Sequence, residues 1–467
     1  MTADDVRILR LTEHRSGSLE DSWVQAVPAS FWEQTKTTVT RAPGQDGWSV
    51  QAEAYVGIAR VDTEVGPLTL HISPKLARCD PFFLADYAYG QRHQPLRHLP
   101  GEQALVDQVR NDPAACLLLW HVLAIHRFSA RWLRRDQVTL TQNLDGKAKG
   151  SIQLSRYITK HLAVADAATI PCRVRERTQD TPNNRILKAG LRRAAALAKS
   201  LPVPGARRAV HAAVNAALPR FAQVADVPGS PRDLRDTSTK GPLRHYTGVL
   251  NATIGFLQGN YLSDDLGSTG TTAFLWSMPT LFQEALRGVL TEASTLRLIE
   301  DVPTATIHDS TGAKRSSSKV DPDYVILRPD GTTLLLDAKY KHTASTTDTG
   351  TDLVAIPGAR RIRVPRADIY QMAAYRQHDR WETPTGALVY PISLHPGEAL
   401  PAPYEVRGFG QPIHICFMDV GPGARANLPR FLIHIDSLAA GPTVPCCPAS
   451  GHPSRSSGRL LAISNPA

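Results

Sequence analysis

Apolar and polar residues alternate over short stretches near the start of the chain and give way to longer apolar runs further on. Residues 48–56 and 68–72 show the two-residue alternation of half-buried strands, separated by turn-forming residues. Residues 114–128, in contrast, are apolar on nearly every side of a helix, which predicts a buried helix. We therefore expect a small β-rich N-terminal module over residues 1–100, followed by a helical region.

Two further patterns predict helices in the middle of the chain. Residues 184–201 are amphipathic and rich in alanine, with Asn183 or Asn184 as the candidate N-cap. Residues 244–260 show a second helical pattern. We expect a mainly helical middle region over residues 101–262.

Residues 321–340 contain the pattern of a β-hairpin whose strands carry charged residues at their far ends. Pro329 supplies the φ of about −65° that a type I turn needs, and Gly331 suits the left-handed position of a three-residue loop. Counting back along both strands from this loop places Asp323 directly opposite Asp337.

The same hairpin predicts a candidate metal site. Side chains alternate along a strand, so Asp337 and Lys339 share one face while Ala338 points to the other. Residues 334–336 are all leucine, which predicts a buried central strand. The carboxylates of Asp323 and Asp337 would repel each other, and a divalent cation between them would remove the repulsion. The alternative is an ordinary exposed hairpin with solvated acids, which the buried leucine run disfavours.

This combination of acids and lysine resembles the PD-(D/E)XK nuclease core. Asp323 matches the first acid of that motif, and Asp337 and Lys339 match its second half. Further segments, taken in their order along the chain, narrow the resemblance to the McrC family, the nuclease subunits of McrBC-type modification-dependent restriction systems. These segments are residues 56–58, 70–75, 144–147, 178–188, 274–284, 367–375 and 386–391.

Two of the matching segments bear directly on the candidate site. One resembles the family helix that carries Gln-x-x-x-Tyr, and its Gln371 and Tyr375 are four residues apart on one helix face. Residues 274–284 resemble the helix that opens the domain, where the family usually has Leu-Phe-Glu. Gln283 stands in place of that glutamate, and Glu284 follows about 100° round the helix. We therefore do not expect an acidic ligand from this helix, although Glu284 as a substitute stays an open alternative.

The resemblance implies an α/β chain of several domains, in which a PD-(D/E)XK restriction-endonuclease-like domain covers residues 263–440 and has a mixed central sheet flanked by helices. It implies hydrolysis of DNA with Mg²⁺ or Mn²⁺ held by Asp323, Asp337 and the backbone carbonyl of Ala338. Lys339 would orient or deprotonate the attacking water. The implied catalytic residues, of which the last two would position a phosphate or the lysine, are Asp323, Asp337, Lys339, Gln371 and Tyr375.

The resemblance also implies a partner, an AAA+ motor that resembles McrB and hydrolyses GTP or ATP. Residues 1 to about 260 would dock on this motor and stimulate it. The chain itself has no complete phosphate loop, because residues 145–148 lack the first glycine and the Ser or Thr of that motif. Two alternatives stay open: a free-standing nuclease that needs no motor, and a catalytically inactive adaptor of a defence complex. The intact acids and lysine argue against the adaptor.

Positive charge gathers in two parts of a chain whose net charge is +10. Close before Gln371 stands a cluster that we interpret as a binding site for DNA phosphates, formed by Arg360, Arg361, Arg363 and Arg366. A second group, between Arg127 and Lys160, is interpreted as a solvated face, a DNA contact or a protein contact.

The composition of the chain and its N-terminal pattern indicate the cellular compartment. No apolar run reaches the ~18–20 residues of a membrane span, and the N-terminus lacks the pattern of a signal sequence, so we expect a cytoplasmic protein without a membrane partner. The six cysteines show no ligand-like spacing apart from Cys446 and Cys447, which stand near His452 in a Pro/Gly/Ser-rich tail. We expect this tail, residues 441–467, to be disordered and residues 342–357 to form a mobile loop.

Overall fold

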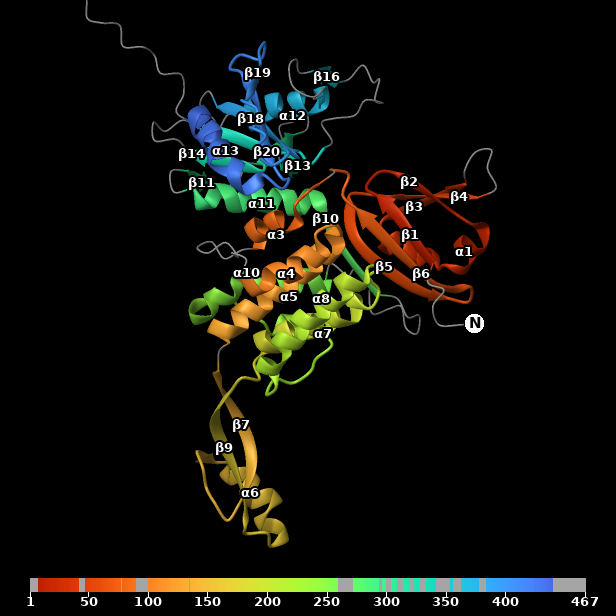
Figure 1. Ribbon diagram of the computed structural model, residues 1–467. Helices are drawn as coiled ribbons and strands as arrows, with labels where there is room; N and C mark the ends of the chain where they lie inside the picture. Colours follow the sequence, from red (N-terminus) through yellow and green to blue (C-terminus); the bar gives the residue numbers. More distant parts are fainter. Residues whose placement is uncertain are drawn as a thin grey trace, which may run out of the picture.

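The chain folds into a β-rich part, a helical part with a projecting arm, and a C-terminal part built on a larger sheet (Figure 1). The computed structural model describes residues 7–41, 47–76, 78–89, 100–133, 135–258, 272–293, 296–299, 304–308, 314–319, 322–327, 333–341, 353–355, 363–377 and 384–439.

The β-rich part contains two sheets within the described residues. The first, which we call the N-terminal sheet, has the strand order β1-β6-β5-β10, with β1 parallel to β6 and the other neighbours antiparallel. The second has the order β2-β4-β3. Their strands and the two short helices beside them are β1 Arg7–Thr12, β2 Ser16–Leu19, α1 Asp21–Ala26, α2 Ala29–Gln34, β3 Thr37–Arg41, β4 Trp48–Ala52, β5 Tyr55–Thr63 and β6 Gly66–Ser73.

The last strand of the N-terminal sheet comes after the helical part in the sequence. Strand β10 (Thr272–Ser277) pairs with β5, so Leu275 lies opposite Gly57 and joins the core of the β-rich part. This strand differs from the prediction, which placed a helix over residues 274–284 within the C-terminal domain. The helix α11 (Met278–Glu292) begins only after Ser277, whose hydroxyl accepts a hydrogen bond from the Thr280 amide at 3.4 Å.

The helical part has α5 (Pro113–Trp132) at its centre, as the apolar pattern predicts. Asp112 is its N-cap and accepts a hydrogen bond from the Ala115 amide at 3.0 Å. By length and composition α5 could cross a membrane, but 78% of its apolar 18-residue stretch is buried inside the protein. Around it pack α3 Pro81–Tyr89, α4 Pro100–Val109, α7 Pro182–Ala198, α8 Pro204–Ala217 and α10 Thr247–Gln258, while α9 Pro231–Arg235 packs on α7. The N-cap of α7 is Thr181, two or three positions before the predicted asparagines.

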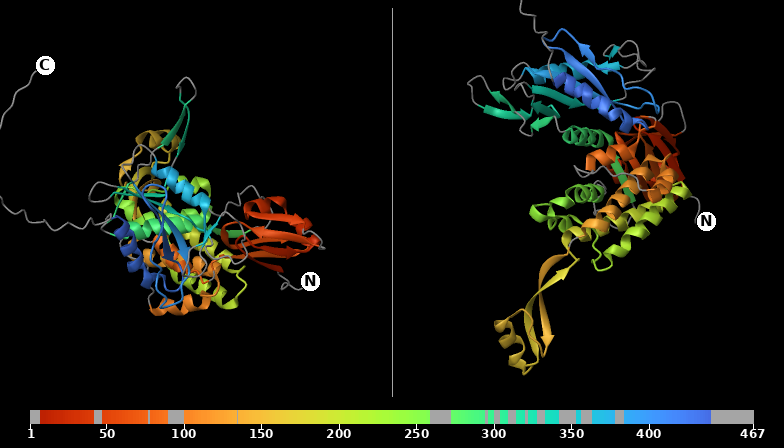
Figure 2. Two further views of the ribbon diagram at one scale, coloured as in Figure 1. Left: turned by 90° about the horizontal axis from the view of Figure 1, so that it is seen from above. Right: turned by 60° about the vertical axis from the view of Figure 1, so that its left-hand side comes forward.

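A β-hairpin arm projects from the helical part, which was predicted as mainly helical (Figures 1 and 2). Strand β7 (Asp136–Asp145) pairs along its whole length with β9 (Thr169–Thr178), and β8 (Ser151–Ile152) adds a third, short strand. The helix α6 (Leu154–Lys160) lies at the distal end of the arm.

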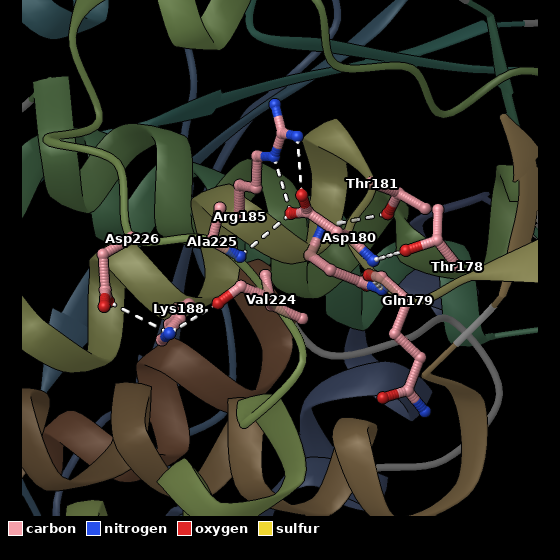
Figure 3. Close-up of polar contacts among 10 residues, drawn as sticks. Thr178, Gln179, Asp180, Thr181, Arg185, Lys188, Val224, Ala225 and Asp226 are labelled. Atoms are coloured by element: carbon pink, nitrogen blue, oxygen red, sulfur yellow. Dashed lines mark hydrogen bonds and ion pairs between the residues drawn. The ribbon is translucent and has the colours of Figure 1, made fainter. Parts of the chain in front are cut away.

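The root of the arm is tied to α7 by charged side chains (Figure 3). Asp180, just after β9, accepts two hydrogen bonds from the Arg185 guanidinium, both of 2.7 Å, and one from the Ala225 amide at 2.9 Å. Lys188 donates to the Val224 carbonyl at 2.6 Å and forms an ion pair with Asp226. These contacts fix the direction in which the arm leaves the helical part.

The C-terminal part is built on a sheet with the order β11-β14-β15-β18-β20-β19, which we call the six-stranded sheet. Strands β15, β18 and β20 run parallel, and α11, α12 and α13 pack against the sheet. The bounds are β11 Arg297–Ile299, β14 Tyr324–Leu327, β15 Thr333–Ala338, α12 Arg366–Arg376, β18 Thr385–Ile392, β19 Tyr404–Val406, β20 Ile413–Asp419 and α13 Ala424–Ala439. Two small sheets complete this part, one of β12 Thr304–His308 with β13 Lys314–Lys319 and one of β16 Leu353–Ala355 with β17 Arg363–Pro365.

Several sequence-based expectations lie outside the described residues. They concern the predicted mobile loop, except for β16, and the tail with Cys446, Cys447 and His452. Arg360 and Arg361 also lie outside, and of Arg363 only the backbone is described.

Candidate active site

The hairpin that carries the candidate acids has the predicted register. Leu327 pairs with Thr333 and Tyr324 pairs with Leu336, so the next residue on each strand brings Asp323 opposite Asp337. The predicted central strand is also confirmed, because β15 lies between β14 and β18 and its three leucines are fully buried. The site therefore forms at the end of a buried central strand.

Asp323 is held by two hydrogen bonds from different elements. Its Oδ1 accepts one from the Gln283 side-chain amide at 2.6 Å, and its Oδ2 accepts one from the Ala338 backbone amide at 2.7 Å. Gln283 comes from α11, the helix from which no acidic ligand was expected. The sequence marked this position as a lost glutamate, but the amide that replaces it still reaches the site.

Asp337 and Lys339 meet on the face where the alternation places them. The carboxylate of Asp337 is buried, and its Oδ2 forms an ion pair with the Lys339 ammonium group. That oxygen lacks an aligned hydrogen bond within the described residues, so the contact is one of charge. Lys339 Nζ donates to Gln371 Oε1 at 2.8 Å, and Gln371 Nε2 donates to the Tyr375 hydroxyl at 2.6 Å. The structure thus brings all five predicted site residues together around one strand end.

Burial and mutual repulsion make it costly to ionise both acids. Burial, followed by the negative charge of Asp337, raises the pKa of Asp323 to about 7. Burial also raises the pKa of Asp337, which the charge of Lys339 partly offsets. The site therefore favours added positive charge, and two carboxylates with the neighbouring Ala338 carbonyl are the hard oxygen donors that Mg²⁺ and Mn²⁺ prefer. No group of three His, Cys, Asp or Glu side chains suited to a metal ion occurs in the part of the chain that the structure describes.

A second buried acid fixes the helix that presents Gln371. Asp368 on α12 is buried and accepts hydrogen bonds from the Tyr390 hydroxyl at 2.8 Å and from Lys341 Nζ at 2.5 Å. Tyr390 lies on β18, and Lys341 stands three residues after the end of β15. This anchor was not expected from the sequence, because its partners are distant along the chain.

The two predicted basic groups differ in what the structure describes of them. Arg366 is exposed at the start of α12, as a phosphate contact would require. In the second group Arg127 is largely buried in an ion pair with Glu102, so it is not part of an open basic face. Exposed members of that group, such as Lys147 and Arg156, lie on the arm, away from the candidate site.

Together the fold and the site define a multidomain α/β protein with a pair of facing acids and a lysine at one strand end. The chain belongs to the family described as McrBC 5-methylcytosine restriction system component, whose sequence profile matches residues 50–391. No curated protein matches the sequence.

Two solved structures match this chain, and the first of them supports a similar fold. One is a half-complex from a tetradecameric assembly of Thermococcus gammatolerans McrB AAA+ hexamers with bound McrC. The match has 17% identity and a TM-score of 0.51, and it covers 92% of this chain and 100% of the other. The second is the cryo-EM structure of the Thermococcus gammatolerans McrBC complex, with 17% identity, a TM-score of 0.38 and coverage of 61% of this chain and 87% of the other.

Proposed function

We propose that this chain is the nuclease subunit of a restriction system and hydrolyses phosphodiester bonds of DNA with Mg²⁺ or Mn²⁺ through a PD-(D/E)XK domain. The observation that carries the proposal is the pair of opposed acids, Asp323 and Asp337, with Lys339 in ionic contact with the second. Family membership supports it independently. Because the family description names 5-methylcytosine, DNA with this base is the first substrate to test.

Each site residue has a defined task in this proposal. Asp323 and Asp337 hold the cation, with the Ala338 carbonyl as a further oxygen ligand. The cation, when bound, activates water and neutralises charge on the phosphate. Lys339 holds the attacking water through Nζ and faces the negative charge that develops on the phosphate. Gln371 keeps Nζ in place through the 2.8 Å hydrogen bond.

Substitution of the site strand tests this proposal. We expect Asp337→Ala and Lys339→Ala each to lower the cleavage rate by roughly a thousandfold or more, because each removes several kcal/mol of transition-state stabilisation. The rate is measured on 5-methylcytosine DNA with the motor partner, and the melting temperature reports folding. Arg207→Ala, an exposed change on α8, is the control and leaves the rate unchanged. A rate within about tenfold of wild type in either site variant would exclude this assignment.

We also propose that residues 1 to about 260 dock on an AAA+ motor that resembles McrB and uses GTP or ATP. The projecting arm supports this, because its distal end exposes a group of large apolar side chains that the protein itself does not cover. They are Ile152, Leu154, Ile158, Leu162 and Val164, with exposed fractions between 41% and 70%. Apolar side chains gathered at the end of a projecting element are typical of a protein contact. The solved assembly that this chain resembles in fold contains McrB AAA+ hexamers with bound McrC.

A further inference from the structure

The N-terminal sheet is tied to the strand that carries Lys339 by three side chains. Glu13 directly follows β1, Lys75 follows β6, and Tyr340 follows Lys339. The Tyr340 hydroxyl donates to Glu13 Oε2 at 2.9 Å, and the Lys75 amide donates to the same oxygen at 2.9 Å. Lys75 Nζ donates to the Tyr340 carbonyl at 2.9 Å and lies 4.3 Å from the centre of its ring. We call these three residues the Glu13–Lys75–Tyr340 link.

This link costs free energy because it removes charged groups from water. Glu13 is only 1% exposed, and its Oε1 has no hydrogen-bond partner within the described residues. Burial raises the pKa of Glu13 and lowers the pKa of Lys75. Apolar side chains of the same volume often stabilise a contact as well as buried charged groups or better. A directional charged contact at this place is therefore better explained by a need for exact placement than by stability.

The geometry shows what the link would place. The Lys339 amide donates to the Val389 carbonyl at 2.8 Å, which still belongs to the six-stranded sheet. Directly afterwards the chain turns, with the Lys341 amide donating to the Lys339 carbonyl at 2.7 Å. Tyr340 stands in this turn, so a hold on its carbonyl and hydroxyl is a hold on the main chain of Lys339.

A second connection runs from the N-terminal sheet to Asp323, the acid opposite Asp337. Strand β10 belongs to the N-terminal sheet and continues without a loop into α11, which carries Gln283 to Asp323. One sheet thus reaches both sides of the candidate site, through Gln283 to Asp323 and through Tyr340 to Lys339.

We propose that Glu13, Lys75 and Tyr340 are positioning residues, through which the N-terminal sheet holds Lys339 in place for the reaction. The inference rests on the proposed nuclease function and adds to it that the module expected to dock on the motor also sets the geometry of the site. Displacement of the N-terminal sheet would then move Lys339 through Tyr340 and Asp323 through Gln283.

The test uses the full chain with its motor partner and two readouts. Tyr340→Phe removes only the hydroxyl that bonds to Glu13, and Glu13→Ala removes its acceptor. We expect each to lower kcat by about tenfold, which corresponds to about 1.4 kcal/mol, with KM for DNA changed less than about twofold. Glu13→Gln keeps an oxygen for the hydroxyl and restores part of kcat. Asp62→Asn, in an exposed ion pair with Arg60 on β5, is the control and leaves kcat unchanged.

The second readout is amide hydrogen exchange, which does not require cleavage. In Tyr340→Phe we expect faster exchange at residues 338–341 and unchanged exchange in the rest of the six-stranded sheet. Unchanged exchange at these residues, or an increase over both sheets, would refute the positioning role. If wild type does not cleave DNA, the proposed nuclease function fails, and the exchange data still decide whether the link holds the strand.

Discussion

As long as no cation is bound, the ionised carboxylate of Asp323 lowers the stability of the folded protein. Its pKa is raised to about 7, while an unfolded aspartate has a pKa of about 3.9. Between these values the folded protein keeps a proton that the unfolded chain releases, so stability falls as the pH rises through this window. The penalty is complete above pH 7, where a nuclease would work.

This penalty predicts that Asp323→Asn inactivates the enzyme and stabilises it. The new amide can accept from the Ala338 amide and donate to Gln283 after that side chain turns over, so both hydrogen bonds are kept. In metal-free buffer at pH 8 we expect the melting temperature to rise by a few degrees, since about 1 kcal/mol corresponds to ~2–4 °C in a domain of ~150–250 residues. The gain is smaller at pH 5. Mg²⁺ should raise the melting temperature of wild type but not of the variant, and an equal rise in both would contradict the metal assignment.

His121 predicts a second, opposite dependence on pH. It is fully buried on α5, its ring lies tilted against Phe256 with ring centres 4.2 Å apart, and neither ring nitrogen has a hydrogen-bond partner within the described residues. Burial lowers its pKa to about 3. Below pH 6.5 the unfolded state takes up a proton that the folded state excludes, so stability falls as the pH is lowered toward 3.

We therefore expect His121→Leu to be more stable than wild type, with a difference that grows from pH 8 to pH 5. At pH 8 the gain comes from removing a buried polar group without partners, about 1–3 kcal/mol less any packing cost. Urea unfolding at both pH values measures it. A difference that does not depend on pH would show that His121 does not titrate as its burial implies.

The residues of the site were predictable to different degrees for a physical reason. Asp323, Asp337 and Lys339 are joined by one hairpin, so turn chemistry and strand alternation were enough to bring them together. Gln283 and Asp368 enter through contacts between helices and strands far apart in the sequence, which local patterns do not encode. Their places become known only with the packing of α11 and α12.

At the scale of elements, the segment that leads into α12 carries the basic cluster. Reversing Arg360, Arg361 and Arg363 to glutamate should weaken DNA binding and reduce its dependence on salt, since each lost phosphate contact lowers the log–log slope by about 0.9. Binding to short duplexes over a range of salt concentrations measures the slope.

A control for this change has the same shift in net charge but lies elsewhere. Lys199, Arg207 and Arg208 are exposed on or next to α7 and α8, and their reversal to glutamate should leave the slope close to that of wild type. If the arginine cluster variant keeps its slope and loses motor binding instead, the cluster belongs to the protein interface.

The elements that were predicted best from the sequence are those whose side chains are buried on nearly every side. The apolar helix α5 and the leucine strand β15 are of this kind. The arm was missed because the apolar alternation in its strands is short: in β9 the buried Cys172 and Val174 flank the exposed Arg173, and the strand continues with charged residues. Strand β10 was taken for the start of a helix because its apolar residues run directly into those of α11.

For the whole molecule, the arm offers a clean test of partner binding. Asp136 and Thr178 pair across its root, so their Cα atoms lie about 5 Å apart and a short Gly-Ser linker can replace the arm. We expect this deletion to abolish motor binding and nucleotide-dependent cleavage while the rise of the melting temperature with Mg²⁺ is kept.

The same assay compares wild type with and without the motor. The chain alone should cut 5-methylcytosine DNA weakly or not at all with Mg²⁺, and strongly once the motor and hydrolysable GTP or ATP are present. Robust cleavage by the chain alone would favour a free-standing nuclease. Full stimulation of the arm-deleted protein would move the docking site to other residues before 260.

Strand pairing and the Glu13–Lys75–Tyr340 link both cross the predicted division at residue 263. A fragment that begins at residue 265 would keep β10 without its partner β5, and Tyr340 without Glu13 and Lys75. We therefore expect such a fragment to fold poorly, in contrast to the arm deletion, which cuts no sheet of the body.

The late arrival of β10 also sets an order of events during synthesis. Strand β5 leaves the ribosome with one edge open, and the strand that covers this edge is made roughly 200 residues later, which takes about 10–40 s at ~5–20 residues per second. For that time the nascent chain exposes a row of unpaired backbone groups, a template for wrong pairing and a target for chaperones. The closing strand then emerges ahead of the segment with the acids, so the ribosome delivers a finished N-terminal sheet before it delivers the candidate active site.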